Sequence, residues 1–362
     1  MSLVRKHILK IDPYEAGKPI EELKRELGLK SVIKLASNEN PIGASPKAIA
    51  AIKKNLAYIN RYPDSNGFYL KKKLAKSLGV EPSNIVLGNG SDELIDIIIK
   101  TFVEEDEHII TADHTFLEYK IISNVKGRVV ITVPLKYFKY DLNAIKKKID
   151  KKTKIVFISN PNNPTGTYVT KLEVEEFLNG LPEDVLLVLD EAYDTFIDVN
   201  DYAKGLNLIR NNNVIVLKTF SKAYGLAGLR VGFAVAKREF VSYMEIARQP
   251  FNVNSLAQAG AIAALDDKKF LKRTKKTVLA GKAYLYEHLK KMGLAFVPSV
   301  TNFILIDVGR DGAGLFKEML KFGVIVRDMK QYGLKNYIRV TIGTKKENER
   351  FIQVLRKVMG SK

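Results

Sequence analysis

The 362-residue sequence contains no cysteine and only four histidines. The lack of cysteine excludes disulfide bridges and thiolate chemistry, and it makes a cytoplasmic protein the expectation. The four histidines are scattered, at spacings that do not predict a metal site. The longest apolar runs, such as residues 185–189, are far too short to span a bilayer, and the N-terminus lacks the apolar segment of a signal peptide.

Negative charge is scarce relative to positive charge. Lysine and arginine together number 59 against 40 aspartates and glutamates, which gives a formal net charge of +19. Such an excess is one signature of nucleic-acid-binding proteins. The lysines, however, occur in short runs on helix-like segments, and no arginine-rich arm, aromatic ladder or helix-turn-helix signature accompanies them. We interpret the runs as solvated helix faces and expect no nucleic-acid and no membrane partner.

The pattern of apolar segments predicts an α/β protein. Strands alternate with helices across residues 32–236, which is typical of a doubly wound, mostly parallel sheet. After about residue 240, long helical stretches lead into further strands, which predicts a smaller α+β domain. We therefore expect an N-terminal arm over residues 1–36 that packs with the small domain or a partner subunit, a large domain over 37–245 and a small domain over 246–362.

Lys222 follows the apolar strand expected at residues 214–217. The carboxyl ends of strands are where α/β folds place their chemistry. A lysine there can form a Schiff base with an aldehyde cofactor, although a surface lysine in a polar loop is the ordinary alternative. Thr219, Ser221 and Arg230 lie close by in sequence and can hold a phosphate. Our hypothesis is that Lys222 carries pyridoxal 5′-phosphate (PLP).

Two more loops are expected at the same edge of the sheet. Ser91 and Asp92 follow a short strand and a glycine turn, so they either cap the next helix or bind an anion at its start. Phe116 lies beyond the next strand, where it either stacks on a flat ring or belongs to the core.

Three polar residues complete the expected PLP site. Asp190, directly after a buried strand, suits the ring nitrogen, because a nearby carboxylate favours the protonated form of that nitrogen. Asn163, in a loop fixed by two Asn-Pro turns, and Tyr193 can both donate to the phenolate oxygen.

Several motifs together resemble those of the fold-type I PLP-dependent aminotransferases. These are Asn163-Pro164-Thr165-Gly166, Asp190-Glu191-Ala192-Tyr193, and Ser221-Lys222 with Arg230. Motifs at residues 35–41, 61–64, 88–93, 221–230 and 339–344 are most similar to the histidinol-phosphate branch of that superfamily. The resemblance covers essentially the whole chain. It implies PLP-dependent transamination between L-histidinol phosphate and 2-oxoglutarate, giving imidazole acetol phosphate and L-glutamate in histidine biosynthesis.

The resemblance also implies roles for individual residues. Lys222 would bind the cofactor and shuttle the proton, with Asp190 and Tyr193 as the other catalytic residues. Phe116 stands where the family often has tyrosine, so it can stack but cannot donate a hydrogen bond. Tyr62 would reach the cofactor phosphate of a partner subunit, which implies a homodimer.

The resemblance further implies a set of substrate-binding residues. Arg339 would take the carboxylate of glutamate or 2-oxoglutarate and the phosphate of histidinol phosphate in alternating half-reactions, with Arg327 in support. Tyr14 and Asn38 would line the substrate side. From the residues alone, Tyr14 can equally anchor the arm, and Arg327 can equally be an ion-paired surface arginine.

Three other activities share parts of these motifs. An aromatic amino acid aminotransferase has the same cofactor residues, and a threonine-phosphate decarboxylase has similar phosphate-binding arginines. A DNA-binding regulator built on this fold would carry an added winged-helix domain, whereas this sequence begins almost directly with the expected arm. We expect the histidinol-phosphate activity.

Overall fold

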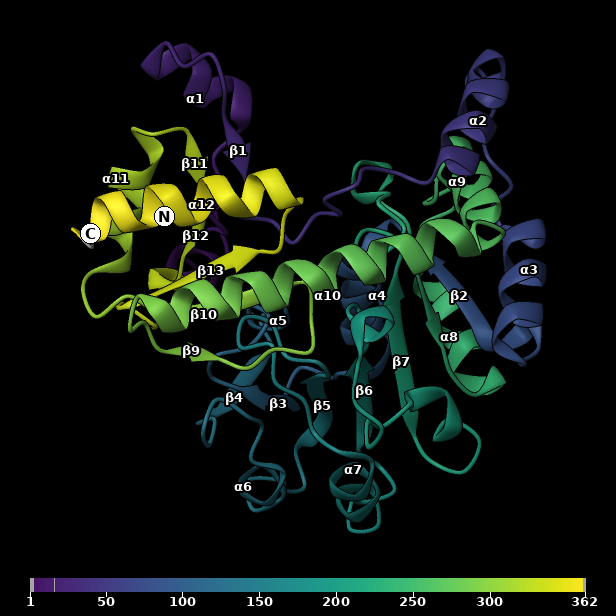
Figure 1. The fold of residues 1–362 in the computed structure, drawn as a ribbon. Coiled ribbons are helices and arrows are strands. Elements are labelled where there is room, and N and C mark those ends of the chain that lie inside the picture. The colour runs from purple at the N-terminus through teal and green to yellow at the C-terminus, as the bar shows by residue number, and fades with distance from the viewer. Residues whose placement is uncertain (1–2, 16, 361–362) are drawn as a thin grey trace.

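The computed structural model describes residues 3–15 and 17–360, which form one large sheet, one small sheet and a two-stranded ribbon (Figure 1). Within this part of the chain, no helix is long and apolar enough to cross a membrane.

The large sheet has seven strands in the order β2-β8-β7-β6-β5-β3-β4. The antiparallel strand β8 (Gly232–Val235) separates β2 (Ile85–Gly88) from β7, and the other neighbouring strands are parallel. The expected mostly parallel α/β sheet is therefore confirmed. The remaining strands are β3 (His108–Ala112), β4 (Val129–Val133), β5 (Thr153–Ser159), β6 (Leu186–Asp190) and β7 (Val214–Thr219).

Two clusters of buried side chains cover the two faces of this sheet. Successive residues of a strand point to opposite faces, so Leu187 and Leu189 join one cluster while Leu186 and Val188 join the other. One face is covered by α2 (Pro46–Asn55), α3 (Phe68–Leu78), α6 (Leu142–Lys146), α7 (Lys171–Leu178) and α9 (Ser255–Leu265). The other is covered by α4 (Gly90–Phe102), α5 (Glu118–Val125) and α8 (Arg238–Ala247).

The C-terminal part of the chain is built around a small antiparallel sheet with the strand order β12-β13-β10-β9. The long helix α10 (Lys268–Lys291) runs from the α2–α9 region to this sheet (Figure 1). The strands are β9 (Phe296–Val297), β10 (Phe303–Asp307), β12 (Arg327–Asp328) and β13 (Tyr337–Thr341), and the other helices are α11 (Gly312–Leu320) and α12 (Lys345–Met359).

Two segments lie elsewhere than the sequence suggests. The strand expected at residues 32–35 does not join the large sheet, because β1 (Ile33–Lys34) pairs with β11 (Val324–Ile325) beside the small sheet. Helix α1 (Ile20–Leu27) packs nearby, through Leu23 against Ile325. Helix α9 lies beyond the expected boundary at residue 246 but packs on α2 and α3 of the large sheet. The domain limits therefore stay a prediction.

Candidate active site

A cavity of about 290 Å³ lies at the carboxyl ends of β5, β6 and β7. It brings together all the residues predicted for the site except Tyr62 and Arg327. The predicted residues that line it are Tyr14, Asn38, Ser91, Asp92, Phe116, Asn163, Asp190, Tyr193, Thr219, Ser221, Lys222, Arg230 and Arg339.

A larger cavity of about 870 Å³ lies between α6, α7 and α10 and holds none of these residues. Its buried cation, Lys282, is already paired with Asp198 at 3.1 Å and with the Ser299 carbonyl at 2.8 Å. The concentration of reactive groups, and not size, therefore selects the smaller cavity as the candidate active site.

Lys222 enters the cavity three residues after the end of β7. The turn that carries it is fixed by the buried Phe220 and by the Ser221 N–H, which donates to Thr219 Oγ1 at 3.1 Å. Lys222 Nζ donates to the Ser37 carbonyl at 3.2 Å. Burial lowers the pKa of the Lys222 amine to about 8, and the charge of Arg339 adds to the effect. About a tenth of the amine is therefore neutral, and nucleophilic, at pH 7, far more than for a free lysine.

Asp190, the last residue of β6, is held by two donors. Tyr119 donates its hydroxyl to Asp190 Oδ2 at 2.7 Å, and the Ala192 N–H donates to Oδ1 at 3.0 Å. Burial raises the pKa of the Asp190 carboxyl to about 6, while these two hydrogen bonds limit the rise. Tyr119 lies three residues after Phe116 in the first turn of α5 and is not among the residues predicted from the sequence.

Tyr193, which follows β6 of the large sheet, is hydrogen-bonded to Asn38, which follows β1. Asn38 Nδ2 donates to Tyr193 Oη at 2.9 Å, which leaves the Tyr193 proton free to be donated into the cavity. The Asn38 N–H donates to Thr341 Oγ1 at 2.9 Å. Burial raises the pKa of Tyr193 to about 12, so the hydroxyl keeps its proton at neutral pH.

Arg339 lies on β13 and points its guanidinium into the same cavity. Its Nη1 donates to Asn163 Oδ1 and its Nη2 to the Ala36 carbonyl, the latter at 2.7 Å. Nε has no hydrogen-bond partner among the residues that the structure describes, although the side chain is buried. The guanidinium as a whole lines the cavity, where its charge can attract an anion.

The start of α4 and Arg230 lie together at one end of the cavity. Gly90 has φ +83°, and a Cβ there would lie 2.4 Å from Arg230 Nη2, so only glycine lets the guanidinium approach the helix start. Arg230 Nη2 donates to Asp92 Oδ2 at 2.8 Å. The N-cap is Asn89, so Ser91 and Asp92 lie within the first turn and do not cap the helix. Their backbone N–H groups belong to the set that an α-helix cannot satisfy internally.

Tyr62 and Arg327 lie outside the cavity. Tyr62 is 83% exposed and stacks on Phe251 at 4.7 Å between ring centroids. Arg327 is buried behind Tyr14, whose ring lies 5.3 Å from the guanidinium carbon, and donates to Gln331 at 3.2 Å. Arg327 has no ion pair among the described residues, so the alternative of an ion-paired surface arginine is wrong.

The donor set fits PLP group by group. The Lys222 amine, with its lowered pKa, can bond to the aldehyde, and the buried Asp190 carboxylate can pair with the ring nitrogen. Arg230, beside the start of α4, can bind the phosphate. The fold and this cavity define a PLP-dependent enzyme of fold type I.

Comparison with known proteins agrees with this class. Residues 30–355 match the family model "Aminotransferase class I and II". Over 357 residues the chain is 46% identical to the histidinol-phosphate aminotransferase of Moorella thermoacetica, covering 98% of this chain and 92% of that protein. The identity to the enzyme of that name from Desulfotalea psychrophila is 48% over 356 residues, covering 97% and 94%.

A solved structure extends the comparison to the fold. Histidinol-phosphate aminotransferase from Sinorhizobium meliloti, in complex with PLP, superposes with a TM-score of 0.91 at 28% identity, covering 99% of this chain and 98% of that one. The chain therefore belongs to the histidinol-phosphate aminotransferases, within the class I and II aminotransferase family.

Proposed function

We propose that the enzyme transfers the amino group between L-histidinol phosphate and 2-oxoglutarate, giving imidazole acetol phosphate and L-glutamate. The observation that carries the proposal is Arg339, a buried guanidinium with an unused Nε donor in the same cavity as the Lys222 amine. Each proposed substrate carries an anionic group that a guanidinium can bind, a phosphate in one half-reaction and a carboxylate in the other. Arg327 would add positive charge behind Tyr14, and Asn38 and Tyr14 would line the substrate side.

We assign the cofactor contacts as follows. When bound, PLP supplies an electron sink for the bonds at the substrate α-carbon. Asp190 would hold the ring nitrogen, Tyr193 and Asn163 the phenolate oxygen, and Phe116 one face of the ring. The phosphate would lie against Ser91, Asp92, Thr219, Ser221 and Arg230.

Lys222 would both attach the cofactor and move the proton. Its neutral amine would be the nucleophile that holds the cofactor at its aldehyde group, and it would be released when a substrate amine takes that place. Once free, Lys222 Nζ accepts the proton from the substrate α-carbon and returns it on the cofactor side. A pKa near 8 suits this exchange, because the amine can both accept and release a proton near neutral pH.

The Tyr119 hydroxyl would keep Asp190 ionised. Below about pH 6 the Asp190 carboxyl takes up a proton and loses the charge that pairs with the ring nitrogen. Tyr119→Phe removes a donor to the ionised form, so the pKa of Asp190 should rise further. We expect the pH below which the apoenzyme loses cofactor affinity to move upward by about 1 to 2 units, the effect of one hydrogen bond to a charged group. Spectroscopic titration of PLP binding against pH measures this shift.

Tyr140→Phe is the matched control for that substitution. Tyr140 is also buried, but its hydroxyl contacts Thr115 and the Ser159 N–H instead of Asp190. An unshifted profile in Tyr119→Phe, or an equal shift in both variants, would show that Tyr119 does not act through the carboxylate.

We propose that the enzyme is a cytoplasmic homodimer in which Tyr62 reaches the cofactor phosphate of the partner subunit. Support comes from a surface rich in exposed apolar side chains around the Tyr62 loop, which soluble proteins commonly bury in an interface. These side chains include Leu56, Tyr58, Ile59, Tyr62, Phe68 and Tyr69. The cytoplasmic location is supported by the proposed substrates, which are charged small metabolites.

Half-reactions with single substrates test the proposed function. We expect histidinol phosphate to convert the lysine-bound cofactor faster than phenylalanine, tyrosine or threonine phosphate does. The loss of the visible absorption band of the lysine-bound cofactor measures the rate of conversion. Arg339→Gln should slow the reaction with histidinol phosphate by about tenfold or more, because a charged hydrogen bond to the substrate is lost. Faster conversion by phenylalanine or tyrosine would favour an aromatic aminotransferase, and release of carbon dioxide from threonine phosphate would favour a decarboxylase.

A further inference from the structure

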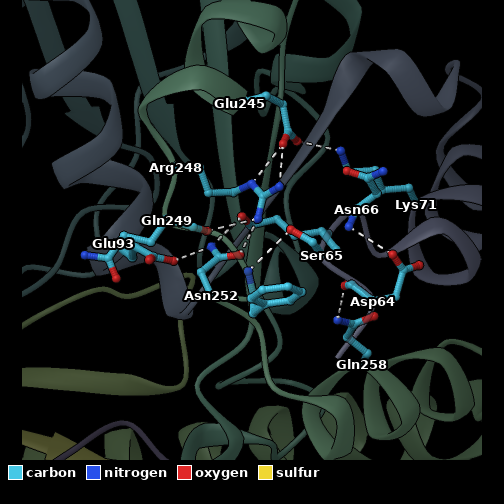
Figure 2. Close-up of polar contacts among 12 residues, drawn as sticks. Asp64, Ser65, Asn66, Lys71, Glu93, Glu245, Arg248, Gln249, Asn252 and Gln258 are labelled. Carbon is cyan, nitrogen blue, oxygen red and sulfur yellow. Dashed lines mark hydrogen bonds and ion pairs between the residues drawn. The ribbon is translucent and has the colours of Figure 1, made fainter. Parts of the chain in front are cut away.

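A cluster of polar side chains connects residues 245–258 with Glu93 and with residues 64–71 (Figure 2). It is centred on residues 248–252, which connect α8 to α9 and which we call the α8–α9 turn. None of these residues lines the cavity. The cluster nevertheless contacts the start of α4 on one side and the loop of Tyr62 on the other.

Asn252 connects the turn to the start of α4. Its Nδ2 donates to the Leu87 carbonyl at 3.1 Å and to Glu93 Oε2 at 2.6 Å. The same Glu93 oxygen accepts the Asn89 N–H at 2.6 Å. Asn252 and Glu93 thus fix residues 87–89, directly before the N–H groups of the first turn of α4.

Phe251 connects the turn to the loop of Tyr62. Its ring stacks on Tyr62 at 4.7 Å, and its N–H donates to Ser65 Oγ at 3.4 Å. Phe251 has φ +61°, which is uncommon for a bulky residue. The backbone of the turn is therefore held in a conformation that the surrounding contacts must enforce.

Arg248 holds the turn itself. Its side chain is only 7% exposed, and its Nη1 donates to Asn252 Oδ1 at 2.8 Å. Its Nε donates to Glu245 at 2.8 Å, and Lys71 of α3 donates to the other Glu245 oxygen at 2.6 Å. Figure 2 shows this chain of contacts running from Lys71 through Glu245 and Arg248 to Asn252 and Glu93. Every charged group in it has a partner of opposite charge or a hydrogen bond, as a buried network requires.

We infer that Arg248 and Asn252 are positioning residues that hold the anion-binding start of α4 and the Tyr62 loop as one unit. The inference rests on the proposed function, in which the start of α4 holds the phosphate of its own subunit and Tyr62 that of the partner. A change in the α8–α9 turn therefore disturbs the phosphate sites of both subunits, although the turn touches neither cofactor.

The substitution Asn252→Leu in the PLP-loaded enzyme tests this inference. It keeps the approximate volume of the side chain but removes the hydrogen bonds to Leu87, Glu93 and Arg248. We expect the ³¹P resonance of the bound cofactor phosphate to move and the PLP dissociation constant to rise roughly tenfold or more. The subunit dissociation constant, measured by sedimentation, should rise in the same variant because the support of Tyr62 is lost.

Asn84→Leu is the matched control. Asn84 also bridges backbone groups, donating to the Ala236 carbonyl at 2.9 Å, but it lies at the opposite end of β2 from the anion site. We expect it to leave the ³¹P resonance and both dissociation constants at the wild-type values. Asn252→Asp serves as a second variant, because it keeps the acceptor for Arg248 Nη1 and removes the donor to the Leu87 carbonyl and to Glu93.

Two results would overturn the inference. One is an unchanged ³¹P resonance and PLP affinity in Asn252→Leu, or in Asn252→Asp if Asn252→Leu does not fold. The other is an unchanged subunit dissociation constant in the variant whose resonance has moved. A failure of the proposed function can be distinguished from a failure of this inference. It would appear in the wild-type enzyme, which would then sediment as a monomer or show no spectral change with histidinol phosphate.

Discussion

Lys222→Ala should reduce kcat with histidinol phosphate by at least about 10³-fold, because the substitution removes the group that we propose both to attach the cofactor and to act as the general base. It should also abolish the visible absorption band of the lysine-bound cofactor. PLP should still bind through the proposed phosphate, ring and phenolate contacts, since these involve other residues of the cavity. Stopped-flow absorbance with histidinol phosphate measures the rate, and the spectrum of the resting enzyme measures the band.

Two control variants separate this effect from a loss of charge or a general loss of lysine. Lys222→Arg keeps a cation in the cavity but cannot attach the aldehyde, so it should be as inactive as the alanine variant. Lys204→Ala, an exposed lysine outside the cavity, should behave as wild type. Steady-state activity at the wild-type level in Lys222→Ala would contradict the assignment.

Asp190→Asn should have the second largest effect, a loss of about 10²- to 10³-fold in kcat, because breaking a buried charge pair typically costs about 3–5 kcal/mol. The substitution preserves the shape of the side chain, and the Ala192 N–H can still donate to the amide oxygen. What it removes is the charge that would keep the ring nitrogen protonated. We therefore expect the cofactor to stay attached to Lys222 while the transfer of the α-proton becomes slow.

Asp150→Asn is the control for Asp190→Asn, because Asp150 is an exposed carboxylate that pairs with His108 far from the cavity. The two reactions to compare are proton exchange at the substrate α-carbon, followed by NMR, and overall turnover. Wild-type exchange in Asp190→Asn would show that the carboxylate has no part in the chemistry.

Most of the large sheet could be predicted from the sequence because its strands are buried on both faces. Residues 186–189 and 214–217 are therefore continuous apolar runs, which are easily recognised. The polar residues at their ends could be predicted for a related reason, since parallel strands bring their carboxyl ends to one edge. Asp190, Tyr193, Ser221 and Lys222 line one cavity as a result.

Other features could not be predicted, because they depend on contacts between distant segments. Residues Ile33 and Lys34 are too short a strand to indicate a partner, and only the folded chain shows that they pair with Val324 and Ile325. Tyr119 looks like an ordinary core aromatic until its hydroxyl is found against Asp190. Asn252 carries no motif at all, and its connection to Glu93 appears only when the turn after α8 is folded against the start of α4.

The central claim is that Lys222 is the residue that holds PLP, and chemical trapping tests it most directly. Borohydride reduces the carbon–nitrogen double bond between a lysine and the cofactor aldehyde to a stable single bond. Digestion and mass spectrometry of the reduced wild-type enzyme should then find the pyridoxyl group on the peptide that contains Lys222, and that modified peptide should be missing in Lys222→Arg. A pyridoxyl group on another lysine, or a reduced enzyme without one, would contradict the account.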